Sequence, residues 1–307
     1  MGKSGEIAFV KSENINGEKW ERCIAEAANS RIYANIWHLD RIADNWEAIV
    51  FGDYEFVMPL PVKKKFGINY VYQPLFCQQL GIYPKPPAQI AALFYKAVYE
   101  KFRYADVHLN AQNPSHSADS EIRFLPRQNY LLDLQYNYKS LARNYSTNTK
   151  RNIAKSAGNN LQFITGISEE EYLAFKHENL IDKLNKKEVD KLKSIISNAR
   201  YRGLGEIYGV YSAENEICAA VFFCRWKNRV IYMNAATSSS GKKLGAMYFL
   251  MDKFIRSNAE QELILDFEGS MIPGVARFYS GFGAIPETYF QLKFNRLPAI
   301  VRWLKPA

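Results

Sequence analysis

LILDFEGS at residues 263–270, followed by PGVARFYSGFGA at residues 273–284, is the stretch that decides how the second half of this chain folds. Its apolar beginning predicts a buried strand, and two carboxylates, Asp266 and Glu268, stand where that strand ends. Pro273 then predicts the first turn of a helix. Polar groups at the carboxyl end of an inner strand, facing a helix N-terminus, form a common substrate site in α/β proteins. The stretch therefore predicts a substrate site.

The bulk composition predicts a folded, soluble and cytoplasmic protein. Of the 307 residues, 48% are hydrophobic and 23% are charged, as in ordinary globular proteins. No apolar run is long enough to span a bilayer, and the N-terminal residues lack a signal-peptide core. The cysteines form no Cys-x-x-Cys pair and have no histidine at metal-ligand spacing, which predicts reduced thiols and no metal site. They are Cys23, Cys77, Cys218 and Cys224.

The net charge of +9 is unevenly distributed along the chain. Residues 134–168 and 217–251 contain no acidic side chain but several lysines and arginines. Such a field favours an anionic partner: a phosphorylated cofactor, a nucleic acid or a membrane surface. A solvated basic face without a partner is the other interpretation.

The order of predicted elements indicates two successive α/β halves of mostly antiparallel character. In the first half, strands 46–51 and 54–60 flank Gly52-Asp53, a strong hairpin signal. The second half begins with a basic helix over 138–158, and Ser168 with Glu171 predicts a capping box for the helix that follows. Its further elements are strands 206–211, 217–224 and 230–235, helix 242–257, strand 262–266, helix 273–281 and strand 289–294.

This second half resembles the Gcn5-related N-acetyltransferase (GNAT) fold: a three-strand meander, a loop, a long helix, a strand and an α/β tail. Asp-Phe-Glu-Gly-Ser at 266–270, followed by Phe278-x-x-x-Phe282-Gly-Ala, is similar to the FemAB-like branch of that superfamily. The resemblance implies an α+β (α/β) chain of two tandem GNAT-like domains, 1–145 and 146–307. Each domain has a mixed, largely antiparallel sheet flanked by helices, and the second carries the site.

The resemblance also implies an acyltransferase that moves an acetyl or aminoacyl group to the amine of a small molecule or peptide. Acetyl-CoA or another acyl-CoA is the expected donor. Residues 168–202 leave no room for the long helical arm that grips transfer RNA in some members, so aminoacyl-tRNA is the less favoured donor. Tyr279 stands where the family often has lysine. The alternative from another class is a non-catalytic module that binds nucleic acid or an acidic cell-envelope polymer through the basic surface.

Acyl transfer needs a base for the amine, an acid for the leaving group and a hold on the donor. The catalytic candidates are Glu268 as base, Asp266 beside it, and Tyr279 as proton donor. The cofactor-binding candidates, in a glycine-containing basic stretch, are Gly241, Lys242, Lys243, Gly245 and Ala246. The substrate-binding candidates are Tyr72, Gln73, Lys150, Arg151 and Arg277.

Each candidate also has a structural interpretation. The stretch 239–246 can be an ordinary turn with glycines for positive φ. Asp266 can anchor a neighbouring loop, and Glu268 can be solvated or paired with Arg277. Tyr279 can be a packing residue, and Ser270 can cap the helix that begins at Pro273.

Overall fold

The computed structural model describes residues 6–117, 119–179, 184–269 and 271–298. The chain forms two compact units, residues 1–127 with 288–307 and residues 128–287, which are considered one at a time below. It passes from one unit to the other in strand β6 (Arg123–Asp133) and returns in strand β12 (Ile285–Asn295). The domain boundary at 145/146 stays a prediction; of the described strands, β12 lies mostly within the first unit. Ser270 lies outside the described residues.

The described part of the first unit is a mixed sheet with three α-helices. Its strand order is β1-β2-β3-β4-β5-β12, and every neighbouring pair is antiparallel except β4–β5. The hairpin predicted at Gly52 is present, with a positive φ of 58° at that glycine. The strands are β1 (Ile7–Lys11), β2 (Trp46–Phe51), β3 (Phe56–Lys65), β4 (Ile68–Tyr72) and β5 (Tyr104–His108). The helices are α1 (Gly17–Glu26), α2 (Ile36–Ile42) and α3 (Ala88–Lys101), with short 3-10 helices at Ser12–Asn14 and Ile32–Ala34.

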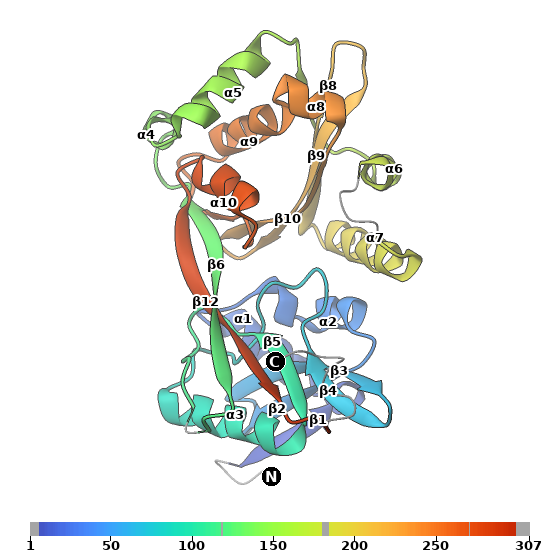
Figure 1. The fold of residues 1–307 in the computed structure, drawn as a ribbon, viewed down its shortest axis with the longest axis vertical. Helices are drawn as coiled ribbons and strands as arrows, with labels where there is room; N and C mark the ends of the chain where they lie inside the picture. The colour runs from blue at the N-terminus through green and yellow to red at the C-terminus, as the bar shows by residue number, and fades with distance from the viewer. Residues whose placement is uncertain (1–5, 118, 180–183, 270, 299–307) are drawn as a thin grey trace. The chain divides into compact units, whose positions relative to one another are not determined.

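The second unit is also a mixed, largely antiparallel sheet. Its strand order is β6-β11-β10-β9-β8-β7, and only β10 and β11 are parallel. Helices α5, α8 and α9 cover one face of the sheet, while α6 and α7 cover the other (Figure 1). The strands are β7 (Gln162–Thr165), β8 (Gly205–Tyr211), β9 (Ile217–Trp226), β10 (Arg229–Thr237) and β11 (Ile264–Asp266). The helices are α4 (Tyr138–Arg143), α5 (Thr147–Ala157), α6 (Glu169–Glu178), α7 (Lys186–Tyr201), α8 (Ser239–Leu244), α9 (Ala246–Ser257) and α10 (Pro273–Ser280).

Two helices that the sequence predicts as continuous are interrupted in the structure. Gly245 adopts a left-handed conformation with φ 74°, which ends α8 and begins α9. Ser146 starts α5 by accepting a hydrogen bond from the backbone N–H of Thr149, and it separates α5 from α4. The capping box predicted at Ser168 is half formed. Ser168 accepts from the Glu171 N–H, but the Glu171 carboxylate accepts from the Tyr211 hydroxyl instead.

Aromatic packing fixes the sheet of the second unit against α9 and α10. The rings of Phe223 on β9 and Phe254 on α9 stack with centroids 4.0 Å apart. Phe267, which directly follows β11, is fully buried and stacks on Phe282 after α10. Burying a phenylalanine stabilises a fold by about 1.5–3 kcal/mol, so the end of β11 is held firmly in the core. The predicted class, α+β with mixed, largely antiparallel sheets flanked by helices, is confirmed.

Candidate functional site

The parallel pair β10–β11 is short and opens toward its carboxyl ends. The two strands pair only from Arg229↔Ile264 to Ile231↔Asp266, after which β11 ends and β10 continues to Thr237. Among the described residues, no strand pairs with β10 on this side over 232–237, which we term the open edge of β10. The ladder between β10 and β9 shifts register between Tyr232 and Asn234, leaving Met233 as a bulge. Bulges and the carboxyl ends of parallel strands are both frequent at ligand sites.

Asp266 anchors the loop that follows β11. Its side chain is almost completely buried, and one carboxylate oxygen lies 2.6 Å from Nη1 of Arg229. The other oxygen accepts a hydrogen bond of 2.9 Å from the backbone N–H of Glu268. Both carboxylate oxygens of Asp266 are therefore bonded within β10, β11 and the adjoining loop. These are the contacts expected if Asp266 anchors that loop.

Glu268 and Tyr279 lie close together beside the end of β11. Glu268 is half-buried and has a positive φ of 55°, so the regular alternation of strand side chains stops at Asp266. Burial raises the pKa of the Tyr279 hydroxyl above its usual range, and the nearby Glu268 and Asp266 charges raise it further. The Tyr279 ring is 8% exposed and packs on Phe267 with centroids 4.9 Å apart. At neutral pH this tyrosine is therefore protonated and able to donate, and Glu268 lies nearby.

Burial and the same Glu268 charge also act on Cys224 of β9. Burial raises the pKa of this thiol well above its usual range, and the carboxylate adds to the increase. Cys224 therefore stays a protonated thiol at neutral pH and is not a nucleophile.

The glycines of the predicted cofactor stretch are explained by close packing. A Cβ on Gly241 would lie 2.1 Å from the backbone oxygen of Cys218 on β9. A Cβ on Gly245 would lie 3.0 Å from the backbone oxygen of Asn152 on α5. Ala246 is buried in the core of this unit.

The two lysines of this stretch lie at the surface of the second unit. Lys242 and Lys243 are exposed on α8, next to the first turn of α9. The N-cap of α9 is Gly245, which offers no side-chain acceptor to the first-turn N–H groups. Positive charge beside an uncapped helix N-terminus suits phosphate groups.

The predicted substrate residues are divided between the two units. In the first unit, Gln73 braces β4 against β5 by accepting from the His108 N–H at 2.8 Å and donating to the Cys77 carbonyl at 2.6 Å. The Tyr72 ring lies under the Lys63 ammonium, 4.2 Å from it. Both residues thus make structural contacts at the end of the parallel strand pair β4–β5.

The remaining substrate candidates lie on helices of the second unit. On α5, Lys150 donates to the Arg143 carbonyl at 2.8 Å and Arg151 donates to Asn148 at 3.1 Å. Arg277 is exposed on α10. Among the described residues, no ion pair joins Arg277 to a carboxylate, so the pairing with Glu268 that was considered is not formed.

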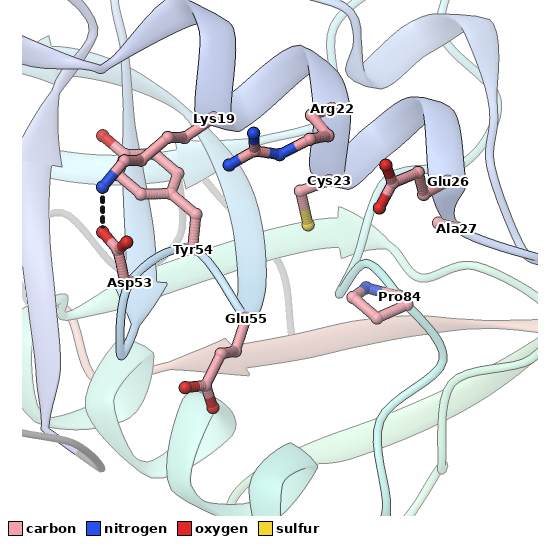
Figure 2. A pocket seen from close by; sticks show the side chains of 9 residues that line it. All are labelled: Lys19, Arg22, Cys23, Glu26, Ala27, Asp53, Tyr54, Glu55 and Pro84. Carbon is pink, nitrogen blue, oxygen red and sulfur yellow. Dashed lines mark hydrogen bonds and ion pairs between the residues drawn. The ribbon is translucent and has the colours of Figure 1, made fainter.

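A hollow of mixed charge lies in the first unit, between α1 and the β2–β3 turn (Figure 2). Lys19 and Asp53 form an ion pair across it. Burial, together with the Glu26 charge, raises the pKa of the Cys23 thiol to about 11, so this cysteine is not a nucleophile either. The other lining residues are Arg22, Ala27, Tyr54, Glu55 and Pro84. The hollow therefore offers charge of both signs.

The described part of the chain contains no cluster of three or more His, Cys, Asp or Glu side chains able to hold a metal ion. None of its helices is both long enough and apolar enough to cross a membrane.

Sequence reasoning missed two features of the open edge of β10. One is the bulge at Met233. The other is Lys176 on α6, a buried lysine whose ammonium contacts β10. A usable signal for Lys176 was its spacing from Tyr172 and Phe175, which places it on the apolar side of its helix.

Several solved structures share the fold along nearly the whole chain. FemX superposes with a TM-score of 0.62 at 11% identity, covering 93% of this chain and 96% of FemX. L-PGS from Bacillus licheniformis gives a TM-score of 0.58 at 13% identity, covering 94% and 93%. An acetyltransferase of the GNAT family from Colwellia psychrerythraea superposes with a TM-score of 0.54 at 13% identity, covering 94% of this chain and 100% of that protein's chain. No protein-family model and no curated protein matches the sequence. On this structural likeness, the chain shares the fold of FemX, L-PGS and this GNAT-family acetyltransferase.

Proposed function

We propose that this protein is an acyltransferase that moves an acetyl or aminoacyl group from an activated donor to an amine, and that the reaction takes place at the open edge of β10. One observation carries the proposal: β10 and β11 part after Ile231↔Asp266, and Glu268 and Tyr279 stand together where they part. The fold shared with FemX and a GNAT acetyltransferase supports this reaction class.

The residues at this edge can supply each step of acyl transfer. The Glu268 carboxylate accepts a proton from the acceptor ammonium, which frees the nitrogen lone pair. The nitrogen attacks the acyl carbonyl carbon, forming a C–N bond and a tetrahedral oxyanion. In this proposal, a backbone N–H of β10 near the Met233 bulge stabilises that oxyanion. The carbon–sulfur or carbon–oxygen bond to the donor then breaks, and the Tyr279 hydroxyl protonates the departing group. As the amide forms, its nitrogen gives up its extra proton to the Tyr279 oxygen, and Glu268 releases to solvent the proton that it took from the ammonium.

An acyl-CoA is the donor that the second unit suits best. Lys242 and Lys243 provide exposed positive charge beside the first turn of α9, where phosphate groups are favourably bound. In this proposal the acceptor is the amine of a small molecule or a peptide. Aminoacyl-tRNA is the competing donor, since the fold is shared with FemX.

We also propose that the two units are tandem GNAT-like domains. In the first unit the meander β2–β3–β4 is followed by α3 and then by β5, which is parallel to β4. In the second, β8–β9–β10 is followed by α8 and α9 and then by β11, which is parallel to β10. The same order of elements, each with one parallel pair, supports a duplicated architecture.

The two donors can be tested side by side. Purified protein is mixed with a set of primary amines and either acetyl-CoA or aminoacyl-tRNA, and acylated amine is followed by mass spectrometry. The proposal predicts product that depends on protein with one of these donors. Absence of product with both donors, over a broad panel of amines, would contradict it.

A further inference from the structure

Lys176 is a buried cation on the inner side of α6. Its side chain is 8% exposed, and Nζ donates to the backbone oxygen of Ala235 on β10 at 3.3 Å. One turn earlier, the fully buried Tyr172 donates from its hydroxyl to Asn234 at 2.7 Å. Two successive residues of β10, just beyond the bulge, thus receive polar side chains from α6.

The direction of the Ala235 carbonyl shows where the Lys176 ammonium lies. Ser238 donates its backbone N–H to Cys218 at 3.0 Å, so the polar groups of Ser238 point toward β9. Successive residues of a strand direct these groups to opposite sides, and the bulge lies before Asn234, so the alternation holds from 235 to 238. The Ala235 carbonyl therefore points away from β9. It faces the open edge of β10, and so does the ammonium bonded to it.

The charge of Lys176 has no counterion in the described protein. Burial lowers the pKa of its ammonium to about 8, and burial is the sole cause of the change. The acidic side chains of α6 are directed elsewhere: Glu169 accepts from Ser197 on α7 at 2.6 Å, and Glu171 accepts from Tyr211 on β8. The remaining titratable side chains of α6 are exposed to solvent: Glu170, His177 and Glu178. On β10 the one charged residue is Arg229, which is paired with Asp266.

An ammonium has three N–H donors, and the Ala235 carbonyl accepts from one of them. A buried charge left in this state is costly unless an anion or further acceptors complete its shell. Because Nζ lies at the open edge, the missing acceptors can come from a molecule bound there. A carboxylate or phosphate oxygen would supply both the negative charge and the acceptors.

We propose that Lys176 recognises an anionic oxygen group, a carboxylate or a phosphate, of the molecule that binds along the open edge of β10. This inference rests on the proposed function for the location of the substrate, and it adds to it the chemical class that the site selects. The neutral Tyr172–Asn234 pair fixes the bulged strand beside the lysine, so that Nζ stays at the edge.

The occupancy of this site can be read directly from Lys176, without turnover. Protein carrying [ε-13C]lysine is titrated with pH by NMR, alone and with acetate, inorganic phosphate or tetramethylammonium chloride at matched ionic strength. The Lys176 signal is identified by its absence in Lys176→Arg. Lys193, exposed on the neighbouring helix α7, is the matched control.

The proposal predicts that acetate or phosphate raises the midpoint of the Lys176 titration saturably, by about one pH unit, equivalent to tenfold preference for the protonated form. The anion with the larger shift identifies the group, while Lys193 and the tetramethylammonium sample show no such shift. Saturable binding in this experiment stands even if no acyl transfer is found. A Lys176 midpoint that neither anion moves, or that moves in parallel with Lys193, would overturn the assignment.

Discussion

The Asp266 carboxylate joins Arg229 at 2.6 Å and the Glu268 N–H at 2.9 Å, so one buried side chain ties the parallel strand pair to the residue that we assign as base. Both charged groups of the Asp266–Arg229 pair are shielded from water. Removing either one alone would leave the other as a buried charge without a partner, which destabilises the fold. This relationship makes Asp266 a positioning residue for Glu268.

Replacing Asp266 by Asn should leave the Arg229 charge buried without its partner. We expect the free energy of unfolding to fall by about 3–5 kcal/mol in urea denaturation. The control is Glu13→Gln, which removes the exposed pair with Lys11 and should change stability by less than about 1 kcal/mol. Equal, small effects of the two variants would show that the buried pair is not structural.

Lys176 gives a stability effect that depends on pH. Its pKa is lowered from 10.5 to about 8 on folding, so the unfolded chain binds more protons between these values. Stability therefore falls as pH decreases from 10.5 toward 8 and changes little from this source below 8. Lys176→Met should be more stable than the natural protein by about 3 kcal/mol at pH 7, with the difference disappearing near pH 10.5. A difference between the two proteins that is constant with pH would contradict this.

Tyr279→Phe should separate chemistry from packing, because it removes only the hydroxyl. If Tyr279 is the proton donor, we expect kcat to fall about 100-fold while the melting temperature changes little. Since the pKa of this hydroxyl is held above its usual range, the natural enzyme should keep its donor throughout the neutral and moderately alkaline range. An unchanged kcat would instead assign Tyr279 to packing.

Gly241→Ala tests whether this glycine serves packing. The new Cβ would meet the Cys218 backbone oxygen at 2.1 Å, which requires α8 to move from β9. We expect a loss of about 1–3 kcal/mol in unfolding free energy. Gly274→Ala, where no atom lies within 4 Å of the new Cβ, is the matched control and should be near neutral. Comparable stabilities of the two variants would contradict the packing role.

Local signals were sufficient to predict most elements of the fold. The Gly52 turn, the apolar periodicity of the helices and the strand that ends at Asp266 all follow from neighbouring residues. The passage of the chain between the two units through β6 and β12 does not follow from neighbouring residues. It depends on the pairing of β12 with β5, whose residues lie more than a hundred positions earlier. No local pattern reports such a pairing.

The candidate site was predicted in part for a similar reason. Glu268 and Tyr279 could be predicted as site residues because they flank one strand and one helix in a continuous stretch, and their roles stay a prediction. The Met233 bulge was not predicted, because a bulge depends on the register between β10 and β9. The positive φ of Glu268 also could not be predicted, because it occurs where the backbone N–H of Glu268 bonds to the buried Asp266 carboxylate.

The central claim is that Glu268 acts as base in acyl transfer at the open edge of β10. Its most direct test is the rate of amine acylation by Glu268→Gln, with Glu262→Gln on the exposed end of the same segment as control. We predict that Glu268→Gln folds normally and acylates at least about 100-fold more slowly, while Glu262→Gln matches the natural protein. Equal rates for the natural protein and a folded Glu268→Gln would contradict the account.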